Sequence, residues 1–219
     1  MTDLSKEALF TTQQIKQNHE NYLERLAFYK KLGLDHIKAR KNIIKNIGTG
    51  YKKILEVGTG KGYLTIPLAK EYDFVVSMDI NQEDQKIALM NAIYENVQNK
   101  IEFVIQNCEE LNIKAKSFDI VISSFTFHHL DKPFQVINEI LKVFKNKLII
   151  TDFNDKGRKI IEKAHILENR KHLYANEEFY ILSYYIKEKG YNVTEFEDEW
   201  QKILIVERQN NLNGISKKM

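Results

Sequence analysis

The chain of 219 residues is 43% apolar and carries a net charge of +3 at pH 7. This length and apolar content predict one globular domain with a sizeable core. No apolar run reaches the length of a membrane span, and the polar N-terminus lacks a signal-peptide core, which favours a cytoplasmic protein. Cys108 is the only cysteine, which excludes a disulfide framework and a zinc-binding cysteine cluster. The net charge is too small to indicate a nucleic-acid partner.

Residues 11–46 are predicted to form two helices. Thr11 or Thr12 can cap the first helix, Gly33 ends it, and Asp35 can cap the second. Between residues 38 and 53, one arginine and five lysines make the segment basic. Such residues form either an RNA-facing patch or, more often, the solvated side of a helix.

A buried strand, a glycine-rich turn and a helix are predicted next. Residues 54–57 form a short apolar run of the kind found in strands covered on both faces. Gly58, Gly60 and Gly62 let the backbone turn sharply without side chains. Pro67 fits only within the first turn of the helix that follows. This arrangement places a ligand at the carboxyl edge of a parallel sheet.

Phosphate-binding interpretations of this turn fail. A P-loop needs serine or threonine directly after its lysine, but Gly62 follows Lys61. The glycine spacing also departs from the dinucleotide pattern Gly-x-Gly-x-x-Gly. Glu56, just ahead of the glycines, repels a pyrophosphate and attracts an ammonium group.

The run Glu56-Val57-Gly58-Thr59-Gly60-Lys61-Gly62 resembles the first motif of class I S-adenosylmethionine-dependent methyltransferases, Glu/Asp-x-Gly-x-Gly-x-Gly. The chain most resembles the type 11-like, small-molecule group of that family. The resemblance implies S-adenosyl-L-methionine as cofactor. It implies that Gly58, Thr59 and Gly60 pack against the methionine part and that Glu56 helps to hold its amino group.

The second predicted strand, residues 74–78, ends in Asp79. The resemblance implies that Asp79 accepts hydrogen bonds from the ribose hydroxyls and that Ile80 lies beside the adenine. Asp79 or Asn81 can also cap the next helix, and one carboxylate can do both.

The third predicted strand, residues 101–105, leads to a segment that resembles the adenine-binding turn of the family. Asn107 stands where aspartate is common, and its amide can still accept from the adenine amino group. Cys108 offers its backbone amide to the ring, and its thiol is expected to be a small buried filler rather than a nucleophile.

The fourth predicted strand, residues 118–123, precedes a His-His-Leu segment that matches the family pattern. The resemblance implies that Ser123 and Ser124 contact the cofactor and that the substrate lies here. Asp/Asn-Pro-Pro-Tyr/Phe, which marks methylation of base amino groups, is absent. Cys108 is in the wrong turn for a cytosine-C5 enzyme, and serines stand where magnesium-dependent catechol enzymes have a carboxylate.

Histidine can remove a proton near neutral pH. His128 and His129 are therefore the first candidates for a catalytic base, followed by Asp152 at the end of the fifth predicted strand, residues 148–151.

Several further side chains are candidates for the substrate pocket. Tyr22 and Tyr29 lie on the first helix, where aromatic residues more often pack into a core. His165, Glu168 and His172 share one face of a helix predicted over residues 156–171. They could bind a metal or a polar substrate, but most such helices are simply polar on one side, so no metal is predicted.

Two alternating strands, residues 191–196 and 201–206, suit the closing hairpin of the family's sheet. The predicted fold is a Rossmann-like α/β sheet of seven strands, mostly parallel with the last strand antiparallel, with helices on both faces. Residues 1–209 form one domain, with a helical lid over residues 11–46 and a core over residues 50–207. Residues 210–219 are expected to be a disordered tail.

The sequence therefore predicts methyl transfer to a small molecule. Two alternatives remain: methylation of RNA or protein through the basic N-terminal helices, and a non-catalytic cofactor-binding scaffold. The acceptor, the attacking atom and the oligomeric state stay open.

Overall fold

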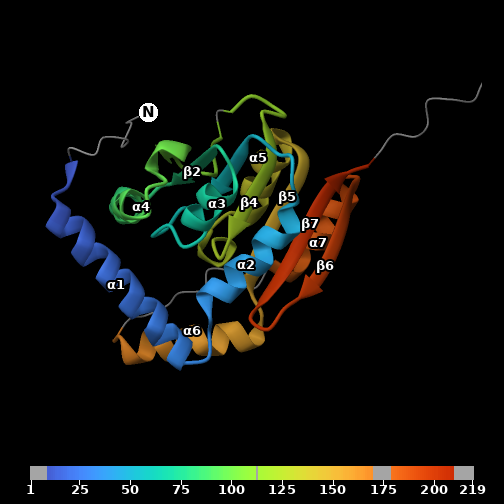
Figure 1. Cartoon of the computed structure of the whole chain (residues 1–219). Helices are drawn as coiled ribbons and strands as arrows, with labels where there is room; N and C mark the ends of the chain where they lie inside the picture. The colour runs from blue at the N-terminus through green and yellow to red at the C-terminus, as the bar shows by residue number, and fades with distance from the viewer. Residues whose placement is uncertain (1–8, 112, 170–178, 210–219) are drawn as a thin grey trace, which may run out of the picture.

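A computed structural model describes residues 9–111, 113–169 and 179–209 of the chain. Its centre is a sheet of seven strands in the order β3-β2-β1-β4-β5-β7-β6 (Figure 1). The strands are β1 (Ile54–Val57), β2 (Val75–Asp79), β3 (Ile101–Ile105), β4 (Phe118–Ser124), β5 (Phe144–Phe153), β6 (Tyr191–Glu197) and β7 (Gln201–Arg208).

Strands β1 to β5 pair in parallel. Strand β7 is antiparallel to both β5 and β6, so only β7 runs against the other six strands. The predicted mostly parallel sheet with an antiparallel last strand is therefore confirmed. Strand β5 begins at residue 144, earlier than predicted, because Phe144 pairs with Phe118 of β4 and Lys147 pairs with both β4 and β7.

Helices cover both faces of the sheet. They are α1 (Thr12–Lys31), α2 (His36–Ile47), α3 (Thr65–Glu71), α4 (Gln82–Tyr94), α5 (Pro133–Val143), α6 (Asp155–Leu167) and α7 (Phe179–Glu188). Apolar side chains of α5 and α7 form one core with the sheet, and those of α2, α3 and α4 form the core on the opposite face. Burial on both sides explains why β1 is apolar along its length except at Glu56.

The chain order reverses at the centre of the sheet, where β1 lies between β2 and β4. Helices that follow strands on either side of such a point leave a crevice at the carboxyl ends of those strands. The loops after β1, β2 and β4 therefore meet at one edge of the sheet, as the glycine motif predicted.

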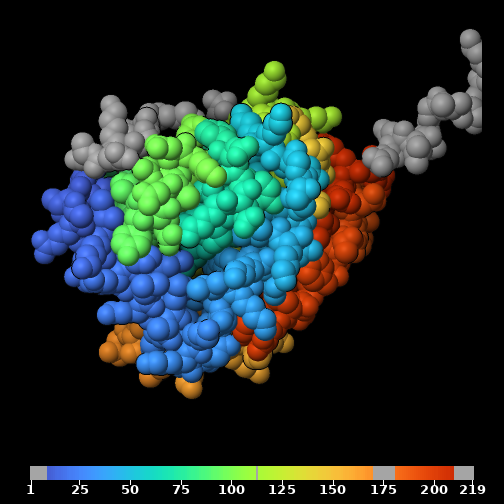
Figure 2. All heavy atoms as spheres, in the orientation of Figure 1, coloured from blue at the N-terminus to red at the C-terminus, as the bar shows by residue number. Residues whose placement is uncertain are grey.

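The N-terminal helices lie at this same edge. Thr11 and Gln14 form a reciprocal capping box at the start of α1, and Asp35 caps α2 as predicted. A third apolar cluster joins α1, the turn after it and α6 to Trp200. Figure 1 shows α1 and α6 together beyond the end of the sheet, and Figure 2 shows the blue N-terminal helices packed against the green α4 segment. Of the helices in the described residues, none combines the length and apolar character needed to cross a membrane.

Candidate active site

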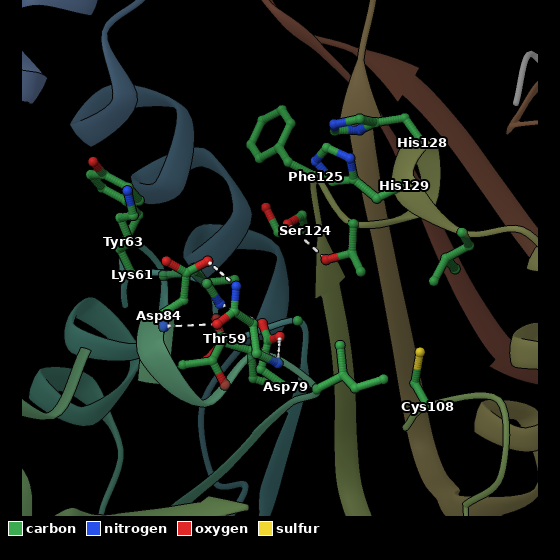
Figure 3. A pocket seen from close by; sticks show the side chains of 18 of the residues that line it. Thr59, Lys61, Tyr63, Asp79, Asp84, Cys108, Ser124, Phe125, His128 and His129 are labelled. Carbon is green, nitrogen blue, oxygen red and sulfur yellow. Dashed lines mark hydrogen bonds between the residues drawn. The ribbon is translucent and has the colours of Figure 1, made fainter. Parts of the chain in front are cut away.

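A cavity of about 830 Å³ opens at the carboxyl ends of β1, β2 and β4. This volume falls within the range of small-molecule sites. Figure 3 shows Thr59 and Asp79 on one side of the cavity and Phe125, His128 and His129 on the other. The loops after β1, β2 and β4 supply both groups, and side chains of α1, α2 and α6 also line the cavity.

The glycine turn presents bare backbone to this cavity. Gly58 has φ +92°, and a Cβ there would lie 2.0 Å from the Thr126 hydroxyl oxygen. At Gly60, with φ +49°, a Cβ would meet no protein atom within 4 Å and would instead project into the cavity. Gly58 is therefore required for packing, whereas Gly60 leaves space for a ligand.

Glu56 is a buried carboxylate on the wall of the cavity. Its Oε2 accepts hydrogen bonds from the Thr65 hydroxyl at 2.5 Å and the Ser77 hydroxyl at 2.6 Å. Burial raises the pKa of Glu56 to about 7, although these hydrogen bonds act in the opposite direction. A bound cation would favour the charged form and lower this pKa.

Asp79 reaches across the glycine turn from the end of β2. Its Oδ2 accepts from the Gly60 amide at 2.7 Å, and its Oδ1 accepts from the Asn81 amide at 2.9 Å. Each carboxylate oxygen keeps a second lone pair that can accept from a ligand hydroxyl. Asn81, not Asp79, caps α4, because its side chain accepts from the amides of the first turn.

The predicted adenine-side residues also line the cavity. Ile80 is 68% exposed and lines the cavity, so its side chain is accessible to a ligand there. The Asn107 side-chain oxygen accepts from the Glu109 amide at 2.9 Å, so this turn is held by its own asparagine. Burial raises the pKa of the Cys108 thiol to about 11, which keeps it protonated and unreactive.

The two serines at the end of β4 differ in position. Ser124 lines the cavity. Ser123 is fully buried, and its hydroxyl donates to the Val57 carbonyl at 3.0 Å, so it joins β4 to β1 and does not line the cavity. Successive side chains of a strand face opposite sides, which is why only one of the pair reaches the ligand edge.

The catalytic candidates His128 and Asp152 form a buried pair. The His128 Nδ1 lies 2.6 Å from Asp152 Oδ1, and the His128 backbone amide donates to Asp152 Oδ2 at 2.9 Å. A carboxylate acceptor at Nδ1 makes this nitrogen the donor, which leaves Nε2 of the neutral imidazole as the acceptor. His128 lines the cavity and Asp152 does not, so Asp152 orients the ring from behind.

His129 also lines the cavity, with its ring centroid 4.0 Å from that of His128. Burial, reinforced by His128, lowers the pKa of His129 to about 4. At neutral pH it is an uncharged and weak base.

The predicted substrate-pocket residues that the structure describes line two different cavities. Tyr29 and His165 line the main cavity, and Tyr29 also packs in the apolar cluster of Trp200. Tyr22 instead lines a smaller cavity of about 410 Å³ beside α4 and stacks on Tyr63 at 5.1 Å. His172 lies outside the described residues. Within the described part of the chain, no group of three potential ligands is arranged to hold a metal ion.

Sequence reasoning missed several residues that line the cavity on the side of the N-terminal helices. They are Arg25, His36, Arg40, Tyr63, Phe125 and Phe153. Arg40 is the arginine of the basic segment expected to face RNA or, more often, solvent, but it is only 7% exposed. The signal was present, because Arg40 is three and seven residues before the buried Ile43 and Ile47 and so shares their face of α2.

Comparison with known proteins shows which proteins this chain resembles. Residues 55–150 match the sequence profile of a family described as "Methyltransferase domain". A ubiquinone/menaquinone biosynthesis C-methyltransferase of Wigglesworthia glossinidia brevipalpis is 30% identical over 119 residues, which cover 52% of this chain and 48% of that protein. A release factor glutamine methyltransferase of Dictyoglomus turgidum is 43% identical over 67 residues, which cover 30% of this chain and 23% of that protein.

The fold is also shared with solved structures. A SAM-dependent methyltransferase of Aquifex aeolicus has a TM-score of 0.62 at 19% identity, over 82% of this chain and 96% of that one. The chain spans less than half the length of the curated relatives named above. The match to the family profile covers residues 55–150, which include the glycine turn, and the structural similarity covers 82% of the chain.

Proposed function

The chain carries a class I S-adenosylmethionine-dependent methyltransferase domain, and from this premise we propose that it transfers the cofactor's methyl group to a small-molecule acceptor. The observation that carries the proposal is the pairing of Glu56 and Asp79 in one cavity, with the bare backbone of Gly60 between them. These groups match a ligand that has an ammonium group and ribose hydroxyls but no phosphate.

The residues present fit this cofactor. Glu56 would hold the amino group, since an ammonium stabilises the charged form of a carboxylate whose burial has raised its pKa to about 7. Asp79 would accept from the ribose hydroxyls with its remaining lone pairs. Ile80, Asn107 and Cys108 would surround the adenine. The Gly60 position admits the ligand because no Cβ fills that space.

When bound, the cofactor supplies an electrophilic methyl group on a sulfonium centre. The chain's own residues then orient the acceptor and remove its proton. His128 is the base in this proposal, because it lines the cavity and the Asp152 carboxylate at Nδ1 favours the tautomer in which Nε2 carries no proton. Asp152 is a positioning residue and stabilises the imidazolium that forms. His129 is the weaker candidate, since burial favours its neutral form.

A small acceptor suits the enclosure of the site. Phe125 and Phe153 pack with ring centroids 4.1 Å apart, next to His128, and side chains of the N-terminal helices line the same cavity. The alternative of RNA or protein methylation relies on a basic outer surface. That surface is weaker than the sequence indicated, because Arg40 faces inward and Lys38 pairs with Glu199 at 3.2 Å.

The test is methyl transfer from radiolabelled S-adenosylmethionine to a panel of phenols, hydroxy acids, thiols and amines, with total RNA and denatured protein as further acceptors. We expect label in one class of small molecule and a background signal in the Asp79→Ala variant. Label confined to RNA or protein would contradict the small-molecule proposal. Binding of cofactor without transfer to any acceptor would favour the non-catalytic scaffold.

A further inference from the structure

Arg40 is a buried cation that neither the fold nor the proposed chemistry uses. It lies on α2, is 7% exposed and lines the main cavity. Burying a guanidinium in a protein interior is unfavourable unless an anion or several hydrogen bonds offset the loss of water. An arginine in this position therefore needs a partner.

The protein supplies only some of the interactions that would offset the burial of Arg40. One terminal nitrogen of Arg40 lies 2.9 Å from His36 Nδ1, and the guanidinium packs over the Phe125 ring at 4.2 Å. The Nε of Arg40 has no hydrogen-bond partner within the described residues. No carboxylate of these residues forms an ion pair with Arg40 within 4.0 Å, whereas Arg25 on the neighbouring helix is paired with Glu168 at 3.0 Å.

Arg40 stays charged under ordinary conditions. Burial lowers its pKa to about 10, which still leaves the guanidinium protonated at neutral pH. His36 is held neutral, because burial and the nearby Arg40 lower its pKa well below the usual value. His36 can thus accept a hydrogen bond from Arg40 and fix the guanidinium without neutralising it.

Arg40 and Glu56 lie in the same corner of the cavity. Each shifts the pKa of the other, although they do not touch as an ion pair. The cavity wall thus offers one buried positive group and one buried negative group near each other. An α-amino acid carries an ammonium and a carboxylate on a single carbon, which is the complementary arrangement.

We propose that Arg40 binds the carboxylate of the cofactor's aminoacyl end while Glu56 holds its ammonium. This inference rests on the proposed function, since it assigns a residue to the same cofactor. It also implies that cofactor joins the N-terminal helices to the sheet, because Arg40 is on α2 and Glu56 is on β1.

The experiment compares two ligands by calorimetry in wild type and Arg40→Gln. S-Adenosylhomocysteine has the aminoacyl group, and methylthioadenosine lacks it while keeping the nucleoside and the sulfur. We expect Arg40→Gln to lower the affinity for S-adenosylhomocysteine by about 10- to 100-fold, as for loss of a hydrogen bond to a charged group. Methylthioadenosine should change by less than about 2-fold, which also shows that the variant pocket is folded.

Lys41→Gln is the matched control, because it removes the same charge from the exposed side of α2. It should leave both affinities unchanged. Arg40→Lys keeps the charge in case Arg40→Gln does not fold, and it should weaken S-adenosylhomocysteine selectively, because a lysine cannot reproduce the planar fork. Equal effects on the two ligands, or no effect on either, would overturn the assignment of Arg40. Failure of wild type to bind S-adenosylhomocysteine at all would instead refute the proposed function.

Discussion

Glu56 links cofactor binding to pH at the scale of one residue. Its pKa in the folded protein is about 7, against an ordinary 4.5, because the side chain is buried. The folded state therefore binds more protons than the unfolded state between these values, and Glu56 makes the free energy of unfolding fall as pH rises from about 4.5 to about 7. A bound ammonium group has the opposite effect on Glu56, because it stabilises the charged form of the carboxylate.

We therefore predict that affinity for S-adenosylhomocysteine rises with pH up to about 7 and then levels off. The expected loss is on the order of 100-fold at about pH 5, two units below the pKa, where binding must release one proton. Calorimetry in buffers of different ionisation enthalpy measures both quantities. Glu56→Gln, which cannot ionise, should bind weakly and without this slope; the same slope in that variant would disprove the role of Glu56.

The pair of His128 and Asp152 makes a second prediction about single residues. With an acceptor found by the panel, Asp152→Asn should lower turnover by about 10²- to 10⁴-fold, because the amide no longer fixes the acceptor nitrogen of His128. Affinity for S-adenosylhomocysteine should stay within about 2-fold of wild type, since Asp152 does not line the cavity. Wild-type turnover in this variant would exclude His128 as an oriented base.

The turn between β1 and α3 tests the account at the scale of an element. Gly58→Ala places a Cβ 2.0 Å from the Thr126 hydroxyl oxygen at a backbone φ of +92°, so strain and collision add. We expect a loss of at least ~2 kcal/mol in the free energy of unfolding. In Gly60→Ala the added Cβ meets no protein atom, so the free energy of unfolding should fall by only about 1 kcal/mol. The same Cβ would fill ligand space, so the affinity for S-adenosylhomocysteine should fall at least ~10-fold.

Urea unfolding and calorimetry on the two variants separate these effects. Gly50→Ala is a useful reference, because Gly50 also has a positive φ and open surroundings but lies outside the cavity. Unchanged cofactor affinity in Gly60→Ala would mean that the ligand does not approach this turn.

The sequence predicts the helices and strands more fully than it predicts the contacts between side chains. The positions of Glu56 and Asp79 near the ends of β1 and β2 could be predicted from apolar runs and glycine spacing, which depend on local sequence. The pairing of His128 with Asp152 depends on the turn after β4 meeting the end of β5, 24 residues further along the chain, which no local pattern encodes. Arg40 was missed because its charge outweighed its position on the buried face of α2. Ser123 and Ser124 could not be separated without knowing which way the strand faces at its end.

At the scale of the whole molecule, the N-terminal helices are part of the active site and are fastened to the opposite end of the chain. The Trp200 indole nitrogen donates to the Gly33 carbonyl at 2.7 Å, and the Gln201 side-chain Nε2 donates to the Ala39 carbonyl at 2.9 Å. The turn between β6 and β7 thus holds α1 and α2 over the sheet. The segment predicted as a lid lines the cavity and is packed in place, and its role as a lid over a bound cofactor stays a prediction.

Trp200→Ala should therefore loosen both helices. We expect it to lower the free energy of unfolding by about 3–5 kcal/mol and to weaken S-adenosylhomocysteine, because Arg40 loses its support. Trp200→Phe keeps most of the apolar contact and should lose about 1–3 kcal/mol, for the unpaired Gly33 carbonyl. Urea unfolding followed by circular dichroism measures the difference. An unchanged cofactor affinity in Trp200→Ala would show that the helices bind no part of the ligand.

The most direct test of the central claim is calorimetric titration of S-adenosylhomocysteine into wild type, Glu56→Ala and Asp79→Ala. Two carboxylates at neighbouring strand ends, facing one cavity across a bare turn, predict micromolar binding to wild type and loss of detectable binding in each variant. Wild-type affinity in both variants would contradict the assignment of this cavity to the methyl donor.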